Sequence, residues 1–112
     1  MRRLHVIQLV PALDAGGVER STLEIAAALV AAGHRASVVS AGGRLVPELE
    51  ALGAEHIALD IGRKSPRVLR HLPALRRLFA GADLVHARSR LPAWLAWWAL
   101  RGLPAAARPR FV

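Results

Sequence analysis

The sequence predicts an α/β fold of the doubly wound type, with a parallel sheet between two layers of helices. Short apolar segments rich in β-branched residues alternate with longer segments of helical periodicity, a pattern typical of parallel strands joined by right-handed helical crossovers. A glycine pair at residues 16–17 separates the first strand from the first helix, as in strand–loop–helix junctions that bind phosphate. A chain of 112 residues is long enough for one domain with one core.

Five strands and four helices alternate in this prediction. Apolar, β-branched runs predict the strands, at residues 5–10, 36–40, 55–59, 83–87 and 108–112. Apolar residues at helical spacing predict the helices, at residues 18–32, 47–52, 66–79 and 91–101. A glycine follows each helix at once or after one residue, as is common at helix C-termini.

The first strand, residues 5–10, is mostly apolar on both faces, which predicts a central position in the sheet. In the common doubly wound order the first and fourth strands are neighbours, and ligands bind where their carboxyl ends meet. This order would place the glycine pair opposite residues 86–90, which follow the fourth strand.

The helices are expected to pack on the sheet through apolar stripes. In the first helix the stripe comprises Ile25, Ala26, Leu29 and Ala32. The third helix begins with Ser65 as N-cap and Pro66 in its first position, and Pro73 inside it predicts a kink or two short helices end to end. Its expected buried stripe comprises Leu69, Leu72, Leu75 and Leu78.

The fourth helix contains the three tryptophans of the chain. Leu91, Trp94, Leu95 and Trp98 share one side of it, which is expected to pack into the core, and Trp97 lies off that side. The alternative for the tryptophans is a belt at a membrane surface.

The chain is strongly basic, with a formal net charge of +8 that comes almost wholly from arginine, Lys64 being the one lysine. Such a balance favours phosphates, nucleic acid or an anionic membrane as neighbours. The alternative is an arginine-rich composition that reflects a GC-rich genome and has no functional cause. The hydrophobic fraction of 54% is high for so small a domain, so some apolar surface is expected to be covered by a partner or by further chain.

Several site classes find no support in the sequence. It contains no cysteine, which excludes disulfides and thiolate metal sites. The apolar runs near both ends are too short for a signal peptide or a membrane span. No catalytic triad, carboxylate pair or phosphate-loop lysine is recognisable. Four of the five histidines have no spacing that would suit a metal site: His5, His34, His56 and His71. No catalytic residue and no metal ligand is therefore assigned.

At Gly16 and Gly17 the missing side chains let the backbone approach an anion, and the following helix offers unpaired N–H groups and a partial positive charge. The pair is therefore a candidate site for a diphosphate. No third glycine completes a dinucleotide motif, and no acidic residue follows the second strand to hold a ribose. Arg44 at that place leaves an NADP-type site as one alternative, and a tight turn without a ligand is another.

His86 stands at the carboxyl end of the fourth strand and is followed by Arg88, Ser89 and Arg90. An imidazole there is suited to contact a sugar hydroxyl or a phosphate, and two guanidinium groups are suited to neutralise anionic groups. The structural alternative is a histidine that only bonds the backbone.

Three stretches carry a family resemblance: P-A-L-D-A-G-G-V-E-R-S-T-L-E-I-A-A-A-L at residues 11–29, V-V-S-A at 38–41, and D-L-V-H-A-R-S-R-L-P-A-W at 83–94. Together they resemble the N-terminal domain of the retaining GT-B glycosyltransferases of family 4. The resemblance covers essentially all of residues 1–112 and implies a Rossmann-like, three-layer α/β/α domain, the N-terminal half of a GT-B fold.

The resemblance implies two groups of site residues. Gly16 and Gly17 would approach the diphosphate of the nucleotide-sugar donor. The acceptor side of the cleft would include Glu19, Arg20, His86, Arg88, Ser89 and Arg90. Many family members have a second histidine where this chain has Arg88, and this departure leaves the acceptor chemistry open.

The resemblance further implies that the parent enzyme transfers a sugar from a nucleotide-diphosphate sugar to a glycan or lipid-linked acceptor, with retention, in bacterial cell-envelope polysaccharide or glycolipid synthesis. No metal cofactor and no nucleic-acid partner are expected. The expected location is the cytoplasm, with a peripheral position at the inner face of the cell membrane. Residues 1–112 are expected to form a domain that is incomplete at its C-terminal end, lacks the nucleotide-binding C-terminal domain and is inactive alone.

Two other functions stay open from the residues themselves. One is an NADP-type nucleotide-binding oxidoreductase fragment, with Arg44 on a ribose phosphate. The other is a non-enzymatic basic module that binds a membrane or a protein partner through its arginines and its tryptophan helix.

Overall fold

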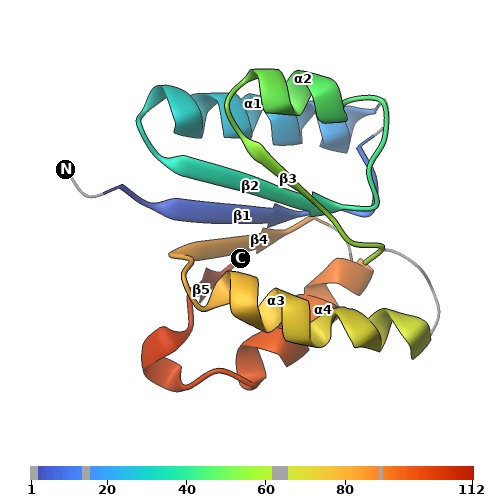
Figure 1. Cartoon of the computed structure of the whole chain (residues 1–112), viewed down its shortest axis with the longest axis vertical. Helices are drawn as coiled ribbons and strands as arrows, with labels where there is room; N and C mark the ends of the chain where they lie inside the picture. The colour runs from blue at the N-terminus through green and yellow to red at the C-terminus, as the bar shows by residue number, and fades with distance from the viewer. Residues whose placement is uncertain (1–2, 14–15, 62–65, 89) are drawn as a thin grey trace.

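The computed structural model describes residues 3–13, 16–61, 66–88 and 90–112 (Figure 1). The strands are β1 (His5–Leu9), β2 (Arg35–Ser40), β3 (Glu55–Ala58), β4 (Leu84–Ala87) and β5 (Arg110–Phe111). The α-helices are α1 (Gly17–Ala31), α2 (Val46–Ala51), α3 (Leu72–Phe79) and α4 (Arg90–Arg101), and the 3-10 helices are η1 (Pro66–His71) and η2 (Ala105–Ala107). Strands and helices alternate as predicted, with ends that shift by one or two residues; the predicted N-cap Ser65 lies outside the described residues.

All five strands are parallel and follow the order β3-β2-β1-β4-β5. β1 lies in the middle, and all five of its residues are buried. The predicted central position of the first strand and its pairing with the fourth are thereby confirmed. Gln8 is in register with His86, and Leu9 with Ala87, so the chain leaves β1 and β4 at the same edge of the sheet.

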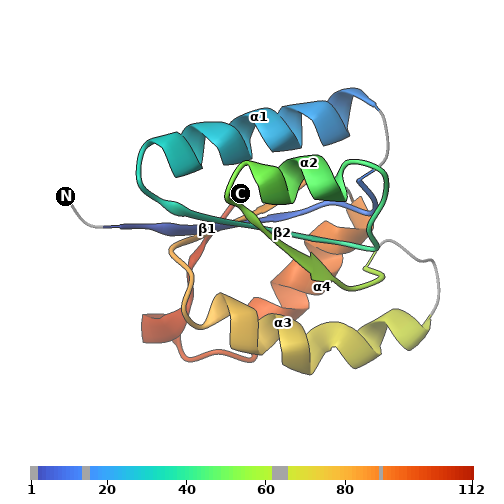
Figure 2. The same cartoon turned by 45° about the horizontal axis from the view of Figure 1, so that its top comes forward.

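Two layers of helices cover the sheet, α1 and α2 on one face and η1, α3 and α4 on the other (Figures 1 and 2). The core under α1 and α2 is built from Val10, Leu13, Leu23, Ala26, Ala36, Val38, Leu45, Leu49 and Ala54. The core on the opposite face includes Ile7, Leu9, Val39, Ile61, Val68, Leu75, Phe79, Val85, Leu95 and Leu100. The predicted three-layer, doubly wound architecture is confirmed.

The third predicted helix consists of two pieces, as Pro73 indicated. The 3-10 helix η1 ends at His71, and α3 begins at Leu72 with the proline in its first turn, where a missing N–H does no harm. The predicted stripe is wrong at one end, because Leu69 is 41% exposed whereas Val68 is 7% exposed. Val68, one residue earlier, takes the buried place in η1 that the prediction gave to Leu69.

The predicted core face of the fourth helix is wrong for Trp94 and Trp98 and correct for Leu95, which is buried. Trp94, Trp97 and Trp98 are 58%, 40% and 45% exposed, and the side chain of Leu91 lies outside the described part. The side of α4 that packs into the core carries Leu95, Ala96, Ala99 and Leu100. The two alanines let α4 lie close against its neighbours, which indole rings at those positions would prevent.

The stripe of α1 is confirmed in part. Ala26 is buried and Leu29 packs against the same core, together with the buried Thr22 and Leu23, whereas Ala32 is the exposed C-cap residue beyond the end of the helix. Within the described residues, no helix is both long and apolar enough to cross a membrane.

Arg76 joins α3 to the last turn of α4. Its Nε donates a hydrogen bond to the carbonyl oxygen of Ala99 at 3.3 Å, and its Nη2 lies 3.5 Å from that of Trp98. A cation suits this place, because the carbonyl groups at a helix C-terminus lack intrahelical partners and carry partial negative charge.

Candidate functional site

The loops that follow β1, β2 and β4 meet at the carboxyl edge of the sheet. The N–H of Leu13 donates to the carbonyl oxygen of Gly42 at 2.9 Å, and the N–H of Leu45 donates to that of Leu13 at 2.8 Å. On the other side, the N–H of Arg88 donates to the carbonyl oxygen of Leu9 at 2.9 Å. The chain near Gly16 and the chain after His86 therefore face one another across the end of β1, as the strand order predicted.

Gly16 has a backbone conformation that suits glycine, with φ +158° and ψ 169°. Its carbonyl oxygen accepts from the N–H of Arg20 at 2.9 Å and so closes the first turn of α1. A side chain at this position would have to displace the Glu19 carboxylate, which lies against Gly16. That carboxylate is favourably placed, since the N-terminus of a helix attracts negative charge.

Gly17 differs from Gly16 in having open space on its side-chain side. Among the described residues, and apart from its chain neighbours and the backbone of α1, no atom lies within 4 Å of the position that a Cβ would take, and its φ is not positive. Gly17 is the first residue of α1, and the N–H groups of the first turn of a helix have no intrahelical partners. The first helical residue thus offers an anion an approach that Glu19 does not occupy.

Arg88 forms a polar bridge between β4, β1 and α1. Its Nε donates to Oε1 of Gln8 at 3.0 Å, and its Nη1 donates to the hydroxyl of Ser21 at 2.9 Å. Gln8 is 1% exposed, and its Nε2 donates to the carbonyl oxygen of Thr22 at 3.2 Å. The bridge fixes the guanidinium charge at the carboxyl end of β1.

The contribution of Gln8 and Ser21 to the site was missed by the sequence analysis. The signal was a glutamine in an otherwise apolar central strand, because a buried amide needs hydrogen-bond partners. The partner could not be found from the sequence, since Arg88 lies 80 residues away and reaches Gln8 only through the pairing of β1 with β4.

His86 is half-buried beside this bridge. Burial lowers the pKa of its imidazole, and the positive charge of Arg88 lowers it further. His86 is therefore neutral at pH 7, and a neutral imidazole both donates and accepts hydrogen bonds. This form suits a contact with hydroxyl groups.

The remaining predicted site residues lie in different surroundings. Nη1 of Arg20 lies 2.7 Å from Oε1 of Glu48 in an exposed ion pair that joins α1 to α2. Ser89 lies outside the described residues. Arg90 is the first residue of α4, and its side chain is likewise outside the described part. Arg44 is exposed in the turn between β2 and α2.

A metal site finds no support in the part of the chain that the structure describes, where no three His, Asp or Glu side chains are grouped so as to hold an ion. The histidines of β1 and β3 have hydroxyl partners instead. Nε2 of His5 lies 2.8 Å from the hydroxyl of Ser37, and Nε2 of His56 lies 2.7 Å from that of Ser40.

Two comparisons with known proteins found glycosyltransferases. The sequence model described as Glycosyltransferase Family 4 matches residues 15–112. The chain is also similar to the crystal structure of a glycosyltransferase from Rickettsia africae ESF-5, with 34% sequence identity and a TM-score of 0.82; the similarity covers 99% of this chain and 29% of that chain. No curated protein matches. Because the family match includes both the glycine pair and the loop after β4, the chain belongs to glycosyltransferase family 4.

Proposed function

We propose that this chain is the acceptor-side, N-terminal domain of an enzyme that transfers a sugar from a nucleotide-diphosphate sugar to a glycan or lipid-linked acceptor. One observation carries the proposal: the open N-terminus of α1 at Gly17 and the anchored guanidinium group of Arg88 meet at one edge of the sheet, in a chain of this family. A helix N-terminus and a guanidinium group both favour the diphosphate of such a donor.

The donor diphosphate is proposed to lie against Gly16 and Gly17. The open side of Gly17 allows an oxygen of the diphosphate to come close to the backbone N–H groups. Glu19 already lies on the Gly16 side, so the approach is expected from the side of Gly17. The charge of Arg88, held at the end of β1, opposes the negative charge of the donor across the same edge.

The acceptor side is proposed to comprise Glu19, Arg20, His86, Arg88, Ser89 and Arg90. Neutral His86 and the Glu19 carboxylate are suited to bond sugar hydroxyl groups, because both accept hydrogen bonds. Arg20 would exchange its Glu48 partner for the acceptor, an exchange that an exposed ion pair permits at small energetic expense.

The whole enzyme is proposed to need more than this domain. The chain spans 29% of the length of the Rickettsia glycosyltransferase, so a C-terminal nucleotide-binding domain is proposed to close the other wall of the cleft. We expect transfer without a metal cofactor and with retention, in bacterial cell-envelope polysaccharide or glycolipid synthesis. The proposed location is the cytoplasm, at the inner face of the cell membrane.

Calorimetric titration with UDP, GDP and NADP tests the phosphate site. The variant Gly17→Ala fills the open side without backbone strain and is expected to weaken binding of UDP or GDP about tenfold, because a Cβ keeps the phosphate from the N–H groups. Gly81→Ala is the matched control, since Gly81 also has open space and no positive φ. An equal loss of affinity for UDP or GDP in both variants would contradict the proposed phosphate site at Gly17.

The same titrations separate the oxidoreductase alternative. If NADP binds more tightly than UDP and GDP, and Arg44→Gln removes that preference, the dinucleotide alternative holds and the transferase proposal fails. A transfer assay with labelled UDP- or GDP-sugars tests the prediction that this chain is inactive alone. Product formed by the 112 residues without another domain would overturn that prediction.

A further inference from the structure

One side of α4 presents tryptophan and arginine to solvent. Trp94, Trp97 and Trp98 are the exposed indoles of this side, and the guanidinium carbon of Arg101 lies 4.3 Å from the ring centre of Trp97. Residues three and four apart share one side of a helix, so these four side chains form one continuous surface. The opposite side of α4 is already occupied by the core.

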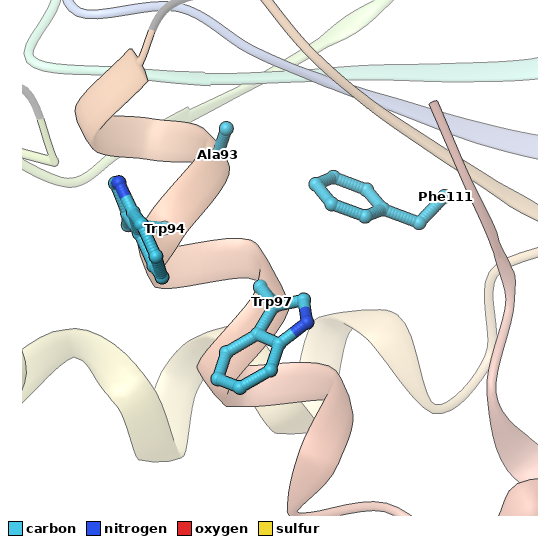
Figure 3. A pocket seen from close by; sticks show the side chains of 4 residues that line it. All are labelled: Ala93, Trp94, Trp97 and Phe111. Atoms are coloured by element: carbon cyan, nitrogen blue, oxygen red, sulfur yellow. The ribbon is translucent and has the colours of Figure 1, made fainter.

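Apolar hollows border this surface on both flanks. The larger measures about 480 Å³ and is lined by Ala93, Trp94, Trp97 and Phe111. Figure 3 shows Phe111 projecting from β5 toward the part of α4 that carries Ala93 and Trp97. The smaller, of about 150 Å³, lies between η1 and α4 and is lined by Val68, Leu69, Trp94, Leu95 and Trp98. We call the exposed set Leu69, Trp94, Trp97, Trp98 and Phe111 the tryptophan face.

The net charge of the chain belongs to the half that contains the tryptophan face. Residues 1–65 hold seven basic and seven acidic residues, whereas residues 66–112 hold nine arginines and one acidic residue, Asp83. The Asp83 carboxylate accepts a hydrogen bond from the N–H of His5 at 2.8 Å and so belongs to the amino edge of the sheet. Six exposed arginines of this half are Arg67, Arg70, Arg77, Arg101, Arg108 and Arg110.

We propose that the tryptophan face of α4 docks on an anionic lipid bilayer. Indole rings favour the boundary between headgroups and acyl chains, where one end of the ring is apolar and the other is wet. Arg101, beside Trp97, and other exposed arginines of this half would pair with lipid phosphate groups. The apolar hollows beside the indoles add hydrophobic area that a charged polymer would leave uncovered.

A surface of arginine and aromatic rings is also suited to bind single-stranded nucleic acid. The contacts of the rings with one another and with Arg101 disfavour this alternative. Arg101 covers one side of Trp97, and Trp94 meets Trp97 edge to face, with ring centres 6.1 Å apart and an interplanar angle of 77°. Bases stack on free, parallel ring faces, so the arrangement favours insertion among lipids.

The inference deepens the proposed function by naming the surface that meets the membrane. It rests on the proposed membrane location and not on the proposed sugar transfer. Its test contains no sugar donor and no acceptor, so membrane docking and sugar transfer can each fail while the other stands.

Intrinsic fluorescence reads this surface directly, because the chain has three tryptophans, all of them on α4, and no tyrosine. Vesicles that contain phosphatidylglycerol should shift the emission to shorter wavelength and, with brominated acyl chains, quench it. Raising the salt from about 0.05 M to about 0.5 M should weaken partition at least tenfold. Unchanged emission, or equal partition into pure phosphatidylcholine vesicles, would overturn the proposal, as would tighter binding of a single-stranded oligonucleotide.

Variants locate the contact. Trp94→Gln with Trp98→Gln keeps Trp97 as the reporter and should weaken vesicle partition at least tenfold, and Arg101→Gln should weaken it about fivefold. The matched controls lie outside the tryptophan face: Val18→Gln removes an exposed apolar side chain, and Arg44→Gln removes an exposed charge. Vesicle sedimentation gives a second readout for every variant. Equal weakening by the controls would show that α4 is not the docking surface.

Discussion

Arginine meets glutamate between α1 and α2, whereas between α3 and α4 it meets a backbone carbonyl group. The first pairing is Arg20 with Glu48 and the second is Arg76 with Ala99; within α4, Arg101 lies over the ring of Trp97. Residues 1–65 are balanced in charge, and residues 66–112 carry the excess. The difference teaches that the basic character predicted for the whole chain belongs to residues 66–112. The glycine loop proposed to bind phosphate lies in the balanced half, so that site rests on the helix N-terminus and on the single charge of Arg88, not on the net charge.

The largest expected effect separates buried from exposed aromatic rings in the same layer. Phe79 is fully buried in the core of α3 and α4, and Phe79→Ala should lower the free energy of unfolding by about 3–5 kcal/mol, because it leaves a cavity. Trp94→Ala removes a larger ring from the tryptophan face and should change it by less than about 1 kcal/mol. Urea denaturation followed by circular dichroism measures both. A comparable loss in Trp94→Ala would show that α4 packs in the predicted orientation, with Trp94 in the core.

The next effect concerns the polar bridge at the carboxyl edge. Arg88→Met leaves the buried amide of Gln8 without its donor and should lower the free energy of unfolding by about 2–3 kcal/mol. Arg101→Met, on the exposed side of α4, is the control and should be near neutral. In the double variant with Gln8→Met the loss should be smaller than the sum of the single losses, since the two groups are partners. Additive losses would mean that the hydrogen bond contributes nothing.

A smaller effect is expected from pH. Burial lowers the pKa of His5, His56 and His86 below 6.5, the ordinary value. The unfolded chain therefore binds more protons just below pH 6.5, so the contribution of these histidines to the unfolding free energy is fully present above that pH and is lost as the pH falls toward the folded-state values. Urea denaturation at about pH 7.5 and about pH 5 measures the loss. His5→Gln should reduce it; an unchanged pH dependence in that variant would exclude His5 as a source.

The smallest effect is expected for the exposed ion pair between α1 and α2. Both side chains are about half exposed, so Arg20→Ala should lower the free energy of unfolding by no more than about 1 kcal/mol, and by less at high salt. Glu48→Ala should give the same small change. A loss comparable to that of Arg88→Met would mean that charge pairing holds the α1–α2 layer as firmly as the buried bridge holds the sheet edge.

The sequence predicted the sheet well because its signals are local. An apolar run on both faces marks β1 as central, and Pro73 marks the break between η1 and α3. The orientation of α4 was not predictable from hydrophobicity alone. Trp94 and Trp98 are apolar and share a side with Leu95, but close packing selects the side with Ala96 and Ala99.

The candidate site was predictable in its position and not in its contacts. The glycine pair and His86 follow strands that pair with each other, so strand order alone brings them to one edge. The contacts of Arg88 with Gln8 and Ser21 depend on side chains 80 and 67 residues away in the sequence. No local pattern encodes such distances.

The contact of Arg76 with the end of α4 has a consequence for sequence variation. Gly102 lies directly against the Arg76 side chain, so any side chain at position 102 would displace the guanidinium group from the carbonyl oxygens of Ala99 and Trp98. Positions 76 and 102 therefore cannot drift independently. Among homologous sequences, a residue larger than glycine at 102 is expected to occur together with a shorter residue at 76, and this covariation is readable without any experiment on the protein.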